Sequence, residues 1–261
     1  MYKIQSKDGT QISCQRSGSG PPLVLIHGAS ADLTRWAPIL PALEMHFTVY
    51  AMDRRGRGGS GDAESYAIQR EFEDVAALID SVAEGGKVDV LGHSFGGLCA
   101  FEAALLTSNI RQLVLYEPAS PGFQEPPDTI ARMRQQLEAG DRDGLLSTFL
   151  LGAAGLTPAE LELMRSVPAW QGRVAAAHTI LRELDGLAAL PPFDAERFRR
   201  LETPTLLLLG GDSVAVYRET IEQIHSMLPN SQIVVMPGQQ HIAMNTAPEL
   251  FLREVLGFLI G

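Results

Sequence analysis

The sequence predicts an α/β fold: a mostly parallel central sheet covered by helices on both faces, with a helical cap inserted between two late strands. Segments such as residues 23–26 and 206–209 are continuously hydrophobic, which is typical of strands buried on both faces of a parallel sheet. They alternate with segments whose apolar residues recur every three to four positions, as in amphipathic helices. With 261 residues, 45% of them hydrophobic, the chain is long enough for one large α/β domain that carries an insert.

Residues 1–118 are expected to form the first part of the core. A hairpin around Lys7-Asp8-Gly9 opens it, since a short turn with glycine separates two strand-like runs. Phe72, Val75 and Ile79 mark the apolar face of one of its helices. The expected strands are 2–6, 10–17, 23–28, 47–53, 88–91 and 111–118, and the expected helices are 33–44 with a kink at Pro41, 66–84, and 98–106.

Residues 119–200 carry no strand signal. They open with a proline-rich segment and then show helical patterns, including the helix-start signal Thr157-Pro158-Ala159-Glu160. The rest of the chain returns to alternation, with expected strands at 204–211 and 231–238 and expected helices at 215–228 and 247–260. We therefore expect an α/β core made of residues 1–118 and 201–261, with residues 119–200 as a helical cap over the edge of the sheet.

A turn that fits the pattern G-x-S-x-G, Gly92-His93-Ser94-Phe95-Gly96, connects the strand 88–91 to the apolar helix that follows. In such a sharp turn the serine adopts a strained backbone conformation that presents its hydroxyl above the sheet edge. A Cβ at Gly92 or Gly96 would collide with the neighbouring strand or helix, so glycine is needed at both positions. A serine hydroxyl is a poor nucleophile at neutral pH, so Ser94 also needs a histidine base and a third group that orients this base.

The chain resembles the α/β-hydrolase superfamily over essentially its whole length. Four signals in the expected order carry the resemblance: His27-Gly28 after an early strand, Asp53 with residues 54–61 after the next, the turn at Ser94, and His241 after the last strand. Within the superfamily the chain looks like the compact, capped members grouped with serine esterases and cofactor-free haloperoxidases. Epoxide hydrolases and haloalkane dehalogenases place an aspartate where this chain has Ser94, which argues against both of those reactions.

The resemblance also assigns the base. The candidates are His27, His46, His93, His178, His225 and His241. His93 directly precedes the serine and is expected to point away from it. His241 lies in the loop after the final strand, where the superfamily carries its base, so the resemblance implies that His241 has this role.

Two carboxylates remain candidates for the acid that orients His241. The superfamily usually supplies the acid three residues beyond the glycine that ends the following strand. Counted from Gly210, this position is Ser213, and Asp212 falls one residue short. Some members instead use a carboxylate at the end of the preceding strand, which here is Glu117. A buried carboxylate is costly unless it is paired, so we favour Glu117 and keep Asp212 as the alternative.

The superfamily's oxyanion hole uses two backbone N–H groups, which correspond here to those of Ala29 and Phe95. Such donors, aimed at the developing negative charge, are worth about 3 kcal/mol each. The side chains expected to line an apolar substrate cleft are Trp36, Phe123, Phe149, His178 and Met244. The leucine and alanine content of the expected cap favours a neutral or hydrophobic substrate.

The bulk composition limits the partners. A formal net charge of −10 argues against nucleic acid or an anionic membrane surface as the main partner. The first residues lack the apolar segment of a secretory signal, and no run reaches the roughly 18 apolar residues of a spanning helix, so we expect a cytoplasmic location. The sequence has neither a phosphate-binding glycine loop nor a cluster of ligands at metal spacing, so no cofactor and no metal are expected. Oligomeric state is left open.

The sequence therefore predicts a serine hydrolase that cleaves an ester-type bond (carboxylic ester, thioester or lactone) of a small neutral or hydrophobic molecule through an acyl-enzyme. The same residues would also hydrolyse a carbon–carbon bond beside a ketone, or transfer the acyl group to an acceptor other than water, and sequence does not separate these reactions. A ligand receptor that keeps the fold but has little turnover is a rival from another class. The short chain and the expected cap disfavour a peptidase.

Overall fold

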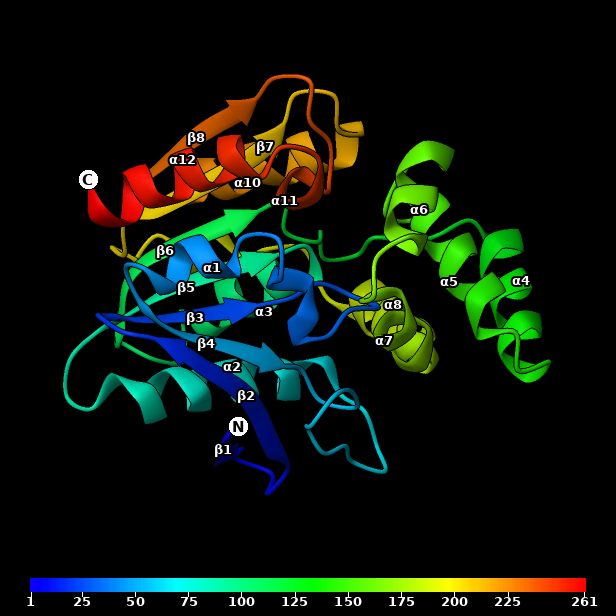
Figure 1. The fold of residues 1–261 in the computed structure, drawn as a ribbon, viewed down its shortest axis with the longest axis horizontal. Coiled ribbons are helices and arrows are strands. Elements are labelled where there is room, and N and C mark those ends of the chain that lie inside the picture. Colours follow the sequence, from blue (N-terminus) through cyan, green and yellow to red (C-terminus); the bar gives the residue numbers. More distant parts are fainter.

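A single eight-stranded sheet forms the centre of the computed structural model, which describes residues 1–261 (Figure 1). Its strand order is β1-β2-β4-β3-β5-β6-β7-β8. Strand β2 pairs antiparallel with both β1 and β4, and all other pairs are parallel. The strands are β1 (Tyr2–Gln5), β2 (Gln11–Gly18), β3 (Pro22–Ile26), β4 (Thr48–Asp53), β5 (Val88–His93), β6 (Ile110–Tyr116), β7 (Thr205–Gly210) and β8 (Ser231–Met236).

Helices cover both faces of this sheet, and each face has its own buried apolar cluster. One face packs against α2 (Ile68–Ala83), α3 (Phe95–Ala103) and α10 (Ala215–Met227). The other packs against the 3-10 helix η1 (Leu33–Trp36), α1 (Leu40–Glu44), α11 (Ala243–Thr246) and α12 (Pro248–Ile260). The predicted fold class, a mostly parallel sheet with helices on both faces, is confirmed. None of the helices combines the length and the apolar character needed to cross a bilayer.

The helix expected over 33–44 is divided into η1 and α1. Pro38 and Pro41 cause this division, because a proline has no backbone N–H and its ring clashes with the preceding turn in a helix interior. Pro41 lies within the first turn of α1, where its missing N–H has no cost. The expectation of one kinked helix was therefore wrong. Along the chain, η1 comes directly after the loop that follows β3.

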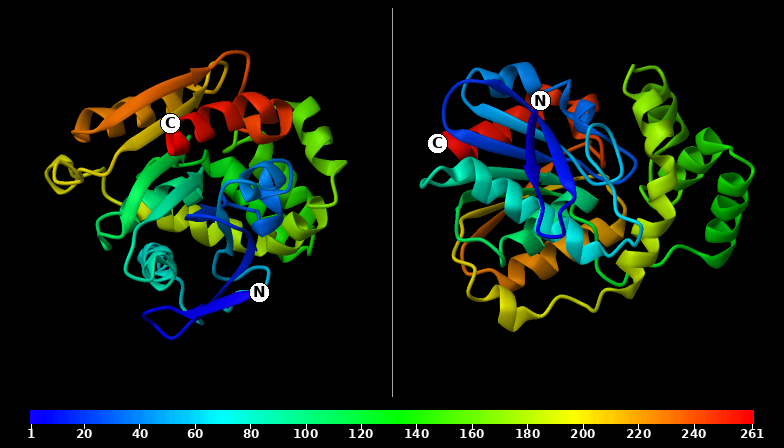
Figure 2. Two further views of the ribbon diagram at one scale, coloured as in Figure 1. Left: turned by 60° about the vertical axis from the view of Figure 1, so that its left-hand side comes forward. Right: turned by 90° about the horizontal axis from the view of Figure 1, so that it is seen from below.

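Residues 119–200, called here the helical insert, lie between β6 and β7 and contain no strand. Figures 1 and 2 show α4 to α8 gathered on one side of the sheet, beyond the carboxyl ends of its parallel strands. The insert has a buried apolar cluster of its own, which Ile242 joins from the core. Its helices are α4 (Pro127–Glu138), α5 (Arg142–Leu151), α6 (Pro158–Arg165), α7 (Trp170–Ala176), η2 (Ala177–Thr179), α8 (Ile180–Ala189) and α9 (Ala195–Phe198).

The turn between β5 and α3 has the strained geometry that its sequence predicts. Ser94 has φ 56° and ψ −127°, in a region that residues with a side chain rarely adopt. A Cβ at Gly96 would overlap the carbonyl oxygens of Ile26 and His27, and a Cβ at Gly92 would lie 2.7 Å from the backbone of the first turn of α3. Both glycines therefore allow the backbone of the turn to pack directly against β3 and α3.

Replacing Gly96 by alanine is expected to destabilise the fold. The added Cβ would meet backbone atoms that cannot rotate away, and overpacking of this kind costs about 1–3 kcal/mol. The free energy of unfolding, measured by urea titration, should fall by about this amount in Gly96→Ala. Gly257→Ala is the matched control, because Gly257 lies in the exposed part of α12 and an added methyl group there would meet no other atom within 4 Å. That variant should gain about 0.5–1 kcal/mol. Equal unfolding midpoints for Gly96→Ala and the wild type would contradict the assigned packing.

Candidate active site

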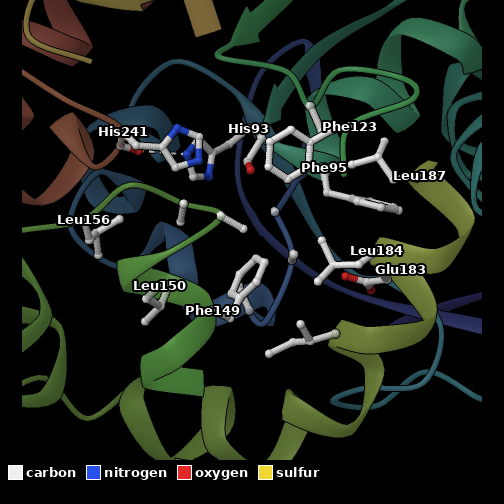
Figure 3. Close-up of a pocket in the computed structure, with 18 of the residues that line it drawn as sticks. His93, Phe95, Phe123, Phe149, Leu150, Leu156, Glu183, Leu184, Leu187 and His241 are labelled. Atoms are coloured by element: carbon white, nitrogen blue, oxygen red, sulfur yellow. Dashed lines mark hydrogen bonds between the residues drawn. The ribbon is translucent and has the colours of Figure 1, made fainter. Parts of the chain in front are cut away.

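A cavity lies between the carboxyl end of the sheet and the helical insert (Figure 3). Ser94 and His241 both line it, together with Gly28, Ala29 and Phe95 from the core. Most of the remaining lining is apolar, since 17 of its 26 residues are hydrophobic. The cavity therefore brings the serine of the G-x-S-x-G turn and the histidine of the last loop to one mainly apolar space.

Glu117, and not Asp212, contacts the histidine. The Nδ1 atom of His241 lies 2.6 Å from Oε2 of Glu117. The other carboxylate oxygen, Oε1, accepts a 2.7 Å hydrogen bond from the backbone N–H of Gly210. Glu117 is fully buried, so both oxygens need such partners. Asp212 is exposed and its side chain has no hydrogen bond, and the N-cap position of α10 is occupied by Val214.

Backbone hydrogen bonds hold the ends of β5 and β6 together. The N–H of Ser94 donates to the carbonyl of Tyr116 at 2.9 Å, and the N–H of Ala119 donates to the carbonyl of Ser94 at 3.1 Å. Glu117, between these two partners, has φ 43° and shares the left-handed region with Ser94. The serine and the carboxylate are thus fixed to each other through the main chain.

The ring of His241 is held between two aromatic neighbours. Tyr217 from α10 stacks on it, with ring centroids 4.3 Å apart and an interplanar angle of 9°. The second neighbour is His93, whose ring centroid lies 4.6 Å from that of His241. Nε2 of His93 also lies 2.9 Å from the carbonyl oxygen of His241 (Figure 3). His93, expected to point away from the serine, lines the cavity, and its side chain supports the histidine loop.

A tyrosine at the end of β6 also holds the histidine loop. The hydroxyl of Tyr116 donates to the carbonyl of Gln240 and accepts from the N–H of Ala243 at 3.1 Å. Both partners flank His241, so the loop is fixed on each side of the histidine. Burial, followed by the nearby Glu117 carboxylate, raises the pKa of the Tyr116 phenol well above its usual range, which keeps the hydroxyl protonated as a donor.

The loop after β3, which carries Gly28 and Ala29, packs closely against the serine. A Cβ at Gly28 would lie 2.9 Å from Cβ of Ser94, so only glycine permits this approach. The N–H of Ala29 has no hydrogen-bond partner within the protein, and Phe95 is the first residue of α3, where a helix leaves the N–H groups without intrahelical acceptors. The guanidinium of Arg54 lies 4.3 Å from the centroid of the Phe95 ring and supports it.

Of the side chains expected to line the cleft, Phe123 and Phe149 do so. The prediction for Trp36 and Met244 is wrong, because both are fully buried in the apolar cluster under the opposite face of the sheet. The prediction for His178 is also wrong. This residue is exposed on the helical insert, where Nδ1 contacts the carbonyl of Ala175.

The sequence analysis did not predict several polar residues that also line the cavity, among them Arg35, Arg173, Glu183 and Tyr217. Tyr217 follows the apolar spacing of α10, so its sequence context indicates a core residue. Arg173 carried a readable signal, since it is the single charge in the run from residue 167 to residue 177 and a lone cation among apolar residues indicates a buried charge. Nothing in the local sequence distinguishes Arg35 from a surface arginine.

Glu183 ties the helical insert to the core. Its Oε1 atom accepts hydrogen bonds from Nη2 of Arg54, at 2.9 Å, and from Nη2 of Arg57. Arg54 also forms a two-bond pair with Glu71 of α2, both bonds at 2.8 Å. All four side chains are buried, so this is a balanced ionic cluster of two cations and two anions between α8, α2 and the loop after β4.

Three comparisons with known proteins each span nearly the whole chain. A model of the alpha/beta hydrolase family matches residues 23–254. The 2-(acetamidomethylene)succinate hydrolase of Mesorhizobium japonicum is 24% identical over 258 residues, which cover 95% of this chain and 91% of that protein. The pimeloyl-(acyl-carrier protein) methyl ester esterase of Aeromonas hydrophila is 28% identical over 261 residues, with coverage of 96% and 99%.

Among solved structures, the crystal structure of an alpha/beta hydrolase from Sphaerobacter thermophilus superposes with a TM-score of 0.83 at 35% identity. The match covers 98% of this chain and 99% of that one. Similarity of sequence and similarity of structure therefore point to one fold and to hydrolytic chemistry.

Protonation of His27 is expected to make the fold sensitive to acid. Burial lowers the pKa of His27 well below its usual value, with further lowering by the charges of Arg54 and Arg57. Below about pH 6.5 His27 therefore binds a proton in the unfolded chain but not in the folded chain. As the pH decreases further, the free energy of unfolding falls by up to about 1.4 kcal/mol per pH unit. Above this pH the contribution is fully present.

Urea titrations between about pH 7 and about pH 5 test this. In His27→Gln the free energy of unfolding should fall less steeply with decreasing pH than in the wild type. The difference between the two slopes should be about 1.4 kcal/mol per pH unit. His178→Gln is the control, since His178 is exposed and its loss should leave the slope unchanged. Parallel slopes for the wild type and His27→Gln would show that His27 accepts a proton in the folded state.

Proposed function

The chain belongs to the alpha/beta hydrolase family, and from this premise we propose that it is a serine hydrolase that cleaves an ester-type bond of a small molecule through an acyl-enzyme. The observation that carries the proposal is the 2.6 Å contact between His241 and a fully buried Glu117 at the cavity that Ser94 lines. A nucleophile, a base and an orienting acid on separate strand ends are the parts that acyl transfer requires.

In the first half-reaction the hydroxyl oxygen of Ser94 attacks the carbonyl carbon of the substrate. Nε2 of His241 takes the hydroxyl proton and then returns it to the leaving-group oxygen as the carbon–oxygen bond breaks. Glu117 accepts from Nδ1–H of His241, which fixes the tautomer with Nε2 free to act as base and stabilises the imidazolium that forms. The products are a released alcohol and an acyl group on Ser94.

The negative charge on the carbonyl oxygen needs donors that are already in place. The N–H groups of Ala29 and Phe95 are proposed for this role, since the first has no other partner and the second starts a helix. The N-terminus of α3 adds a favourable partial positive charge at the same point. Preorganised donors of this kind cost no rearrangement when the tetrahedral intermediate forms.

In the second half-reaction a water molecule replaces the alcohol. His241 takes a proton from the water, the hydroxide oxygen attacks the acyl carbon, and Ser94 leaves as an alcohol with the same proton. Tyr217 and His93 are positioning residues in this scheme, because they contact the ring and the main chain of His241 and do not themselves exchange protons with substrate. Burial keeps the pKa of His93 well below its usual value, and the charges of His241 and Arg35 lower it further, so His93 stays neutral beside the base.

The helical insert is proposed to act as the cap of this site. Phe123, Phe149 and Leu184 from the insert line the cavity (Figure 3). An apolar cover of this kind excludes bulk water and strengthens each electrostatic contact inside. Ester-type chemistry is favoured over other acyl transfers by the esterase activity named for one relative.

Replacing Ser94 by alanine should abolish turnover and leave the fold intact. The side chain is small and half-exposed, whereas the loss of the nucleophile lowers kcat by at least about a thousandfold. Hydrolysis of short p-nitrophenyl esters measures the activity, and a fluorophosphonate probe followed by mass spectrometry locates the nucleophile. Full activity in Ser94→Ala, or a probe that labels a different residue, would exclude this nucleophile. A wild type without any adduct would favour a ligand receptor instead.

The two candidate acids give opposite expectations. Glu117→Gln should lower kcat by about two to four orders of magnitude, because the amide cannot stabilise the imidazolium and can favour the wrong tautomer. Asp212→Asn is the matched control and should retain activity within about twofold, since Asp212 is exposed with no contact to His241. Circular dichroism confirms that each variant is folded. If Asp212→Asn is the variant that loses activity, the assignment of Glu117 is wrong.

A further inference from the structure

Two arginines line the catalytic cavity without an acidic partner. Arg35 lies in η1, just beyond the loop that carries Ala29, and Arg173 lies in α7 of the helical insert. Their exposed fractions are 4% and 5%. Neither guanidinium has a carboxylate oxygen within the 4.0 Å of a salt bridge. Two buried cations from different parts of the fold thus reach the same cavity.

The hydrogen bonds of these arginines leave most of their donors free. Nη1 of Arg35 donates to the side-chain oxygen of Asn245, while its Nε and Nη2 have no partner. Nη1 of Arg173 donates to the carbonyl of Ser30 at 3.3 Å, its single hydrogen bond. Buried donors of charged groups are normally satisfied, so Nε and Nη2 of Arg35 lack an acceptor within the protein.

The carboxylates nearest to the pair do not fill this gap. Asp32 raises the pKa of Arg173 through its charge, but its Oδ1 atom caps η1 by accepting from Thr34, and Asp32 forms no salt bridge with either arginine. Glu183, the acidic residue in the cavity lining, is already paired with Arg54 and Arg57. Neither acid therefore pairs with Arg35 or Arg173.

The other buried arginines of the chain behave differently. Arg54, Arg55 and Arg57 each form an ion pair with at least one carboxylate. Burial of a charge is costly unless it is paired, and these three follow that rule. Arg35 and Arg173 depart from it, and they are the two that face the cavity beside the serine.

The pKa values of Arg35 and Arg173 also reflect the lack of a paired anion. Burial, and then the charge of Arg173, lowers the pKa of Arg35 to about 9, and burial lowers the pKa of Arg173 to about 10. Both side chains still carry their protons at neutral pH. An anion placed between them would relieve the cost of burial and the repulsion between the two charges together.

We propose that Arg35 and Arg173 bind a carboxylate of the substrate, so that the hydrolase acts on monoesters of short dicarboxylic acids. The proposal rests on the function proposed above and names its substrate class. A carboxylate fits because its two oxygens match the fork of a guanidinium. The apolar remainder of the lining suits the short hydrocarbon chain between the two ends. The neutral substrate expected from the composition of the insert is thereby replaced by an anionic one.

The position of the pair relative to the oxyanion hole sets the geometry. Arg35 follows the loop that holds Ala29, and Arg173 bonds to Ser30 in the same loop. A carboxylate held there lies on the acyl side of the substrate, close to the carbonyl that Ser94 attacks. Binding at this end aligns the ester carbonyl with the two N–H donors, which is how remote binding energy accelerates the chemical step.

The first test uses the wild-type protein. Hydrolysis of monomethyl glutarate and of methyl pentanoate, followed by pH-stat, gives kcat/KM for two esters that differ in a terminal carboxylate. We expect a preference for the monoester of about 10- to 100-fold, the worth of one or two charge-assisted hydrogen bonds. Equal values, or a preference for methyl pentanoate, overturn the proposal.

A binding measurement separates this proposal from the proposed function. Glutarate, which cannot be hydrolysed, should raise the melting temperature of both the wild type and Ser94→Ala, whereas pentanamide at the same concentration should not. If neither ester is hydrolysed but glutarate still binds, the hydrolase assignment fails and the carboxylate site stands. Stabilisation by inorganic phosphate but not by glutarate overturns the carboxylate site.

The arginines are tested by Arg35→Met and Arg173→Met, which keep much of the side-chain volume without the charge. Each variant should lower the preference for monomethyl glutarate by about tenfold and abolish stabilisation by glutarate. Arg134→Met is the matched control, because Arg134 is an exposed arginine of the helical insert that pairs with Asp185, and its preference should equal that of the wild type. A loss of ligand-free melting temperature with the preference unchanged overturns the proposal, because it shows a structural role.

Discussion

The site depends on a main-chain linkage between two strained strand ends. Ser94 and Glu117 end neighbouring strands and both have positive φ, which is costly for residues with a side chain. The strain persists because Ser94 bonds through its N–H and its carbonyl to residues on either side of Glu117. Glu117 in turn bonds through its N–H to Leu208 and through its carboxylate to Gly210 of β7. Three adjacent parallel strands thus set the positions of the serine and the carboxylate, and a sheet is a more rigid support for such a pair than a loop would be.

The third group, His241, comes from a loop, and it is held by the neighbours of the other two. Tyr116, directly before Glu117, bonds to the main chain on both sides of His241. His93, directly before Ser94, bonds to the carbonyl of His241 itself. Each strained strand end therefore contributes one residue to the proposed chemistry and one residue that anchors the histidine loop. A change at either strand end would displace the base as well as the residue that was changed.

The sequence predicted those features that depend on local patterns. Continuous apolar runs indicated the strands, the G-x-S-x-G turn indicated Ser94, and the cost of burying an unpaired carboxylate favoured Glu117 over Asp212. Side-chain direction was not predictable in the same way. Trp36 is as apolar as Phe149, yet it packs under the sheet while Phe149 faces the cavity. The missing partners of Arg35 and Arg173 were also invisible, because whether a cation is paired depends on residues far away in the sequence.

The distribution of charge across the cavity connects binding to the position of the helical insert. On one side Glu183 of the insert meets Arg54 and Arg57 of the core, which gives a permanent ionic link. On the other side Arg173 of the insert and Arg35 of the core meet with like charge and no anion between them. Arg173 already donates to the carbonyl of Ser30 in the core, and a substrate carboxylate at that point would add an ionic link to this hydrogen bond. With a net charge of −10 the protein does not attract an anion from a distance, and beyond roughly 10 Å salt screens such forces. Selection of a carboxylate must then come from short-range hydrogen bonds inside the mainly apolar cavity, where a low dielectric makes each of them stronger.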